Sequence, residues 1–224
     1  MCADLVAAVV HIEAASRLAI EFGLESNVPN IHQARARLHL QEERWDAAIE
    51  EAALGAARDR AAGRVPNELL GLSQEAEAAW RAGRADAAVA IWQHLATAFE
   101  QRGEEELVRA PRLRLADMRA ASGQPEEVEA ARQTVLAELA AAECEVPLKG
   151  EFGLAARLAA WRVLHRAGDP AAAGQLALAA AELEQALSGF DEPHVRERVA
   201  HVIPWHRDVV EALGRSTAAA PAGG

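Results

Sequence analysis

Apolar side chains recur along the chain at the three-and-four spacing of an α-helix. Two neighbouring segments illustrate the pattern: Leu107, Leu113, Leu115 and Met118 in one, then Val128, Val135, Leu136 and Leu139 in the next. This spacing places apolar side chains on one face of a helix and polar ones on the other. The pattern predicts ten helices, at roughly 2–22, 29–43, 46–63, 66–82, 85–102, 106–121, 125–143, 151–167, 169–188 and 193–213.

Four segments share one motif, in which a short polar or glycine-containing turn is followed by an apolar helical pattern. They are ERWDAAIEEA (43–52), GRADAAVAIW (83–92), GQPEEVEAAR (123–132) and GDPAAAGQLA (168–177). Alignment at Trp45, Ala85, Pro125 and Pro170 gives spacings of 40, 40 and 45 residues. Regular spacing of this kind indicates an internal repeat.

Glycine and proline give the motif a physical meaning. Glycine at 83, 123 and 168 can end a helix in the left-handed conformation. Proline at 125 and 170 suits the first position of the next helix, because the N–H that proline lacks would have no partner there. Each motif therefore predicts a tight corner between two antiparallel helices, near residues 44, 84, 124 and 169.

A single helical hairpin cannot bury its own apolar face, whereas stacked hairpins form a continuous core. The sequence therefore predicts an all-α fold of antiparallel helical hairpins stacked as a tetratricopeptide-like superhelix. The period also fits a HEAT-like α-solenoid, which is the alternative. We expect one helical-repeat domain over residues 1–214, with about ten helices, and a disordered tail over 215–224 because the apolar pattern stops there.

Composition narrows the classes of function. Alanine-rich runs such as ALAAAELEQAL favour helix strongly. The net charge of −11 argues against direct binding of nucleic acid, which needs a basic face. No apolar run has the length of a membrane span. Cys2 and Cys144 are isolated thiols without a CxxC motif, as in a reduced cytoplasmic protein.

Motifs for catalysis or metal binding are missing from the sequence. His201 and His206 lie five residues apart with Pro204 between them, whereas helical zinc sites use positions i and i+4. His194 is the nearest further candidate ligand. The sequence contains no phosphate-binding loop and no GxSxG nucleophile elbow. We therefore predict a protein that is not an enzyme and uses no cofactor or metal.

Basic side chains at helical spacing form a candidate partner-binding groove. In stacked hairpins the first helix of each pair usually lines the concave face. The candidate residues, here called the basic stripe, are His32, Arg35, His39, Arg112, Arg119, Arg157 and Trp161. Such a stripe on an acidic protein could hold an acidic peptide segment. The alternative is that the arginines are ordinary surface residues paired with neighbouring glutamates, and that the tryptophan only fills the core.

The end of the helical pattern carries a more specific signature. This signature has three parts: a corner with an acidic residue and a proline, a helix that bears an arginine, and a segment of the V-P-x-H-R type. The matching residues are, in order, Asp191, Pro193, Arg196, Ile203, Pro204, His206 and Arg207. Together with the preceding residues from about 155, this region resembles the C-terminal tetratricopeptide-like arm of large bacterial ATP-binding regulators, both LuxR-type and cyclase-associated.

The resemblance implies a function. In that family the arm follows a nucleotide-binding switch domain and senses a partner or an inducer. We therefore expect a non-enzymatic protein-interaction scaffold, the sensory arm of a bacterial signalling or transcriptional regulator. Its partner would be a protein or an attached ATP-binding switch domain. The alternatives are a free-standing adaptor for acidic peptide segments and a small-molecule sensor.

Overall fold

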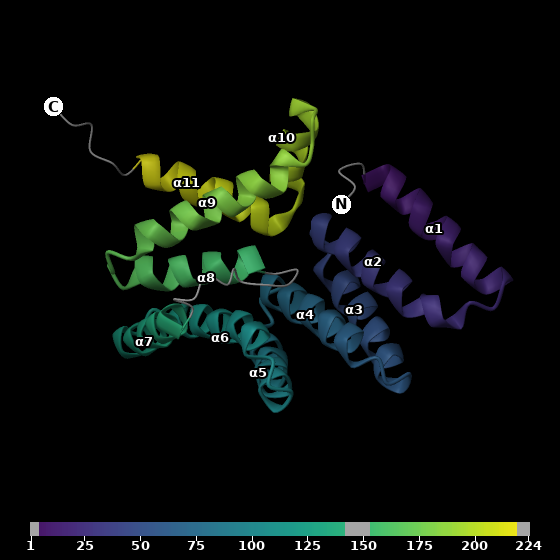
Figure 1. The fold of residues 1–224 in the computed structure, drawn as a ribbon, viewed down its shortest axis with the longest axis horizontal. Helices are drawn as coiled ribbons and strands as arrows, with labels where there is room; N and C mark the ends of the chain where they lie inside the picture. The colour runs from purple at the N-terminus through teal and green to yellow at the C-terminus, as the bar shows by residue number, and fades with distance from the viewer. Residues whose placement is uncertain (1–4, 142–152, 219–224) are drawn as a thin grey trace. The chain divides into compact units, whose positions relative to one another are not determined.

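The computed structural model describes residues 5–141 and 153–218 of the chain (Figure 1). These residues form helices joined by short corners and contain no strand, which confirms the all-α class. The helices are α1 (Leu5–Glu21), α2 (Val28–Gln41), α3 (Trp45–Ala61), α4 (Val65–Arg81), α5 (Ala85–Gln101), α6 (Glu105–Ala120), α7 (Pro125–Ala141), α8 (Gly153–Arg166), α9 (Ala172–Ser188), α10 (Pro193–Val202) and α11 (Pro204–Ala218), with one 3₁₀ turn, η1 (Glu25–Asn27). Among them, none is both long and apolar enough to cross a membrane.

The chain divides into two compact units, residues 1–95 and 96–224, where the sequence predicted one domain. In the first unit α2 packs between α1 and α3, and α3 packs against α4 (Figure 1). In the second unit α8 packs against α6 and α9, and α11 packs against α9 and α10. Most contacts join helices that are close in sequence, as expected for stacked helical repeats.

Left-handed residues mark the corners at a constant interval. Positive φ angles occur at Gly23, Glu43, Gly63, Gly83, Gly103, Gly123 and Gly168, and the first six of these residues are spaced twenty residues apart. The predicted corners near 44, 84, 124 and 169 coincide with four of these positions. The other three corners join one hairpin to the next. The repeat of this fold is therefore a single helix together with the corner that follows it.

Backbone hydrogen bonds explain why the corners are alike. At one corner the Arg84 N–H donates to the Ala79 carbonyl at 2.9 Å, and the Gly83 N–H donates to the Trp80 carbonyl at 3.0 Å. This pair of bonds is the Schellman motif, which satisfies carbonyl groups that the helix end leaves unpaired. Glu43 takes the same left-handed conformation with φ 58°, although it has a Cβ atom.

Small side chains let the helices of the first unit approach closely. A Cβ atom added at Gly71 of α4 would lie 3.0 Å from the Ala56 Cβ of α3. One added at Gly55 of α3 would lie 3.3 Å from the His32 Cβ of α2. Ala52 and Ala56 are buried in the same region. The alanine content of the sequence thus contributes to packing as well as to helix propensity.

Two details of the C-terminal segment differ from the sequence prediction. The single helix expected at 193–213 is two helices, because Ile203 is extended with φ −80° and ψ 120°. A residue before proline disfavours the helical conformation, and Pro204 follows Ile203. Helix α11 also continues to Ala218, so the prediction of disorder from 215 was wrong for residues 215–218. Residues 219–224 lie outside the described part of the chain.

A buried carboxylate links three helices of the second unit. The Asp117 side chain of α6 is 2% exposed and accepts hydrogen bonds from Arg166 Nη1 at 2.7 Å and Arg162 Nη1 at 3.3 Å, both on α8. Arg162 also donates to Asp208 of α11 at 3.0 Å. Arg114, one helical turn before Asp117, lies 3.7 Å from the same carboxylate. Asp117 and Arg114 are both 2% exposed, so these two charges depend on their partners rather than on water.

Replacing Glu43 by glycine should stabilise the protein by about 1 kcal/mol, because a residue with a Cβ atom is strained in the left-handed region. Urea unfolding followed by circular dichroism measures the change. Glu43→Ala is the matched control, since it removes the carboxylate but keeps the Cβ atom. An equal gain from alanine would show that the side-chain charge, and not the backbone, is responsible.

Replacing Asp117 by asparagine should destabilise the protein by about 3 kcal/mol, because it removes a charged partner of the buried Arg114 guanidinium as well as of Arg162 and Arg166. Asp46→Asn is the control. Asp46 also pairs with an arginine, Arg84, but its side chain is 81% exposed and its removal should leave the urea midpoint nearly unchanged. Similar midpoints for the two variants would contradict a structural role for the Asp117 cluster.

Candidate functional site

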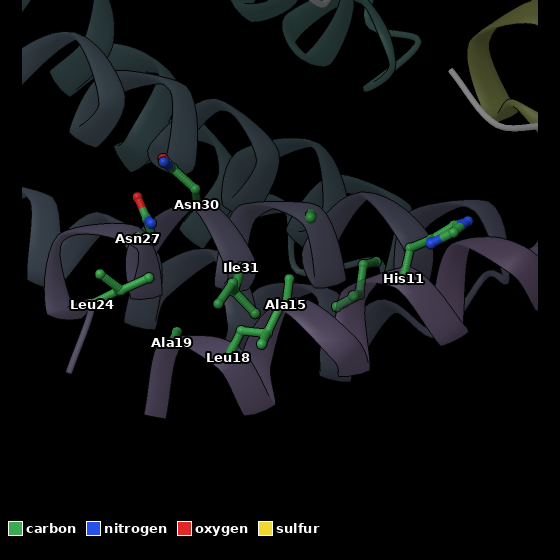
Figure 2. A pocket seen from close by; sticks show the side chains of 10 residues that line it. His11, Ala15, Leu18, Ala19, Leu24, Asn27, Asn30 and Ile31 are labelled. Carbon is green, nitrogen blue, oxygen red and sulfur yellow. The ribbon is translucent and has the colours of Figure 1, made fainter. Parts of the chain in front are cut away.

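An apolar hollow lies along the seam between α1 and α2, near the corner that joins them (Figure 2). Its volume is about 460 Å³. The lining residues are His11, Ile12, Ala15, Leu18, Ala19, Leu24, Asn27, Asn30, Ile31 and Ala34. None of them is an aspartate, glutamate, lysine or arginine, so the surface of the hollow carries no fixed charge.

Small residues on both helices create the space. Ala15 and Ala19 on α1 and Ala34 on α2 are too short to fill the seam, while Leu18 and Ile31 point toward one another across it in Figure 2. The Leu18 side chain is 50% exposed, although leucine is usually buried in a helical array. No sequence motif predicts this site. The only sign of the apolar hollow in the sequence is that apolar residues continue through the corner between two helices.

A second, charged hollow of about 330 Å³ lies farther along the same seam and reaches α3. Its lining residues are Val9, Ile12, Glu13, Arg35, Leu38, His39, Glu42, Arg44 and Glu51. Two members of the basic stripe, Arg35 and His39, are therefore on its wall. The third member on α2, His32, places its Nδ1 atom 2.7 Å from Glu51 Oε2 at the edge of the same region.

Carboxylates neutralise the basic groups of the charged hollow. Arg35 donates through Nη2 to Ser16 Oγ at 2.8 Å and to Glu13 Oε1 at 3.4 Å, and its Nη1 lies 3.9 Å from Glu51 Oε1. His39 Nδ1 lies 3.5 Å from Glu42 Oε2. An incoming acidic segment would have to displace these carboxylates. The acidic-peptide groove therefore stays a prediction, and here the local geometry favours the alternative of paired surface charges.

The other residues of the basic stripe belong to the second unit, where each arginine also has acidic neighbours. Arg112 donates to Glu100 at 2.7 Å and to Glu138 at 3.0 Å. Arg119 pairs with Glu127, and Arg157 donates to Glu182 at 2.7 Å. These pairings join each arginine to its own unit.

Trp161 packs in the core of the second unit. The Trp161 side chain is 7% exposed, and its ring stacks on His165 with the ring centroids 5.3 Å apart. So little exposed surface leaves the indole ring with almost no area for a partner to contact.

The histidines at the C-terminal end lie in different environments. His206 is buried, and its Nδ1 atom lies 3.3 Å from the Val199 carbonyl, to which it can donate. His201 is exposed, and His194 Nε2 lies 3.2 Å from Glu192 Oε2 at the surface. Within the described residues no three histidine, cysteine, aspartate or glutamate side chains are grouped so that they could hold a metal ion. Cys2 and Cys144 lie outside those residues.

No family model, no curated protein and no solved structure matches the chain. The function must therefore be argued from the residues themselves. Of the surfaces described above, the apolar hollow differs most from an ordinary solvated surface, because its lining is uncharged and partly open.

Acid should destabilise the protein through His206. Burial lowers the pKa of His206 below its ordinary value of about 6.5, so the unfolded chain binds this proton more readily than the folded chain. Stability is then lost as the pH falls below about 6.5 toward the lowered pKa. We expect His206→Gln to flatten this part of the curve of unfolding free energy against pH, measured by urea unfolding.

His201→Gln is the matched control, because His201 is exposed and lies five residues before the buried His206. Its pH dependence should follow that of the unmodified protein. A His206→Gln curve that keeps the same slope between neutral pH and pH 5 would show that other groups cause the acid sensitivity.

Proposed function

We propose that the chain is a non-enzymatic protein-interaction scaffold, in which stacked helical hairpins present the apolar hollow to a protein partner. One observation carries the proposal: an uncharged hollow of about 460 Å³, lined from both α1 and α2, remains open beside half-exposed leucine side chains. Exposed apolar surface of this kind is typical of recognition sites rather than of inert protein surface.

The partner's chemistry follows from the lining. A segment that enters the hollow must bring apolar side chains, because no arginine or lysine lines it to receive an acidic group. The hollow lies between two antiparallel helices, which favours an amphipathic helix that lays its apolar face along the seam. We therefore propose an apolar-faced helical segment of another protein, or of an attached domain, as the occupant.

The wider biological role rests on the resemblance of the C-terminal segment. The chain would form a tetratricopeptide-like superhelix and serve as the sensory arm of a bacterial signalling or transcriptional regulator in the cytoplasm. An ATP-binding switch domain, attached or associated, would respond to binding at the arm. The helical array and the helix that begins at Pro204 support this proposal.

Site-specific photo-crosslinking tests the proposal. A photoreactive amino acid at Asn30, which lines the hollow, should crosslink one defined protein segment in cells that produce the protein. The same amino acid at Glu184, an exposed position on α9, should not give that product. Ile31→Glu should reduce the yield about tenfold or more, because it places a charge in the apolar lining.

Circular dichroism of Ile31→Glu must show an unchanged helical spectrum, so that lost crosslinking reports on the hollow and not on folding. Mass spectrometry of the product identifies the contacted segment and shows whether its face is apolar. The proposal is wrong if no protein product forms at Asn30, or if the product is equally abundant with Ile31→Glu.

A further inference from the structure

Exposed apolar side chains are concentrated at one helix of the first unit. Among the described residues, eight large apolar side chains are exposed, and six of them lie on α1 or just after it: Val9, Val10, Leu18, Ile20, Phe22 and Leu24. The other two, Leu54 and Leu178, lie singly on α3 and α9. Single exposed leucines are normal, whereas a cluster on one helix indicates a surface that another chain covers.

Part of this cluster lies on an exposed stripe of α1, in which Glu13 also contacts Arg35 of α2. Val10, Glu13, Arg17 and Ile20 follow one another at intervals of three, four and three residues, which places them on one face of a helix. All four are exposed, and Val10 and Ile20 are 57% and 82% exposed. We call these four residues the α1 stripe.

The order of chemical types along the α1 stripe is symmetric about its midpoint. Reading in either direction gives an apolar residue, a charged residue, a residue of opposite charge and an apolar residue. In an antiparallel pair of such helices, Val10 of each copy meets Ile20 of the other, and Glu13 of each meets Arg17 of the other. We infer that α1 pairs antiparallel with α1 of a second copy through the α1 stripe, around a twofold axis midway between Glu13 and Arg17.

Charge decides the orientation and favours a second copy as the occupant. A parallel pair would place Glu13 against Glu13 and Arg17 against Arg17, and juxtaposed like charges oppose association. The antiparallel pair instead forms two Glu–Arg contacts with a single surface used by both copies, as a twofold interface requires. Glu13 can still make such a contact, because its side chain is 59% exposed although its Oε1 atom accepts a hydrogen bond from Arg35 at 3.4 Å.

The α1 stripe is separate from the apolar hollow that carries the proposed function. Ile31 and Ala34 line the hollow from α2, whereas Val10, Arg17 and Ile20 do not line it. Pairing through α1 and partner binding in the hollow can therefore succeed or fail independently, and Ile31→Glu should leave self-association unchanged.

Analytical ultracentrifugation of the 224-residue chain tests the pairing. The protein should reach twice its 23.9 kDa chain mass, with a concentration-dependent equilibrium. Ile20→Glu should weaken association about tenfold or more, because it places a carboxylate against the apolar Val10 side chain of the other copy. Leu178→Glu is the matched control: it changes an exposed leucine on α9 in the same way and should leave the equilibrium unchanged.

Charge reversal tests the orientation. Arg17→Glu and Glu13→Arg alone should each weaken self-association, since each replaces the two Glu–Arg contacts of the dimer by two contacts between like charges. An equimolar mixture of the two variants should form a mixed dimer, and the double variant Glu13→Arg with Arg17→Glu should associate again. All variants must keep the helical circular dichroism spectrum. A chain that is monomeric throughout, or a dimer that ignores both Ile20→Glu and the charge reversals, would overturn the inference.

Discussion

The reversal of chain direction within three residues is the constraint on which the rest of this structure depends. Consecutive helices can pack side by side only if the chain leaves one and enters the next without a detour. The left-handed residue and its two Schellman hydrogen bonds achieve this at the corners, as at Gly83. With corners twenty residues apart, α3, α4, α5 and α7 all have seventeen residues. Helices of equal length bring their small residues opposite one another, as at Gly71 and Ala56.

Buried polar groups add specificity to this packing. Asp59 near the end of α3 is fully buried and accepts hydrogen bonds from Gln33 of α2 at 2.9 Å and from Arg64 just before α4 at 2.7 Å. Asp117 has the same function in the second unit, where it joins α6 to α8. Many arginines of this acidic protein are thus engaged within their own unit. The recognition surface that we propose is therefore apolar rather than basic, and it lies at α1.

The sequence predicts those features that local chemistry determines. Glycine at 83, 123 and 168 marks three corners because only a residue without Cβ adopts a positive φ without strain. The sequence motif did not predict the twenty-residue repeat, because the glycines at 23, 63 and 103 are not followed by the adjacent alanines of the other corners. The split of the last helix could have been predicted from Pro204, since a proline restricts the residue before it. The ion pairs could not, because partners such as His32 and Glu51 are nineteen residues apart and meet only after the helices stack. The apolar hollow likewise depends on how far apart two helices lie.

The constant interval between corners also has an evolutionary consequence. Two successive helices with their corners make one hairpin of forty residues, and the corners at both ends of the hairpin have the same left-handed conformation. Unequal recombination between two such segments of the gene lengthens or shortens the array by one hairpin while every remaining helix keeps its length and its partners' faces. A single inserted codon within a helix instead turns all later side chains by about 100° and exposes the apolar face. Natural variation in the length of this protein is therefore expected in whole hairpins, or at the corners, and not inside the helices.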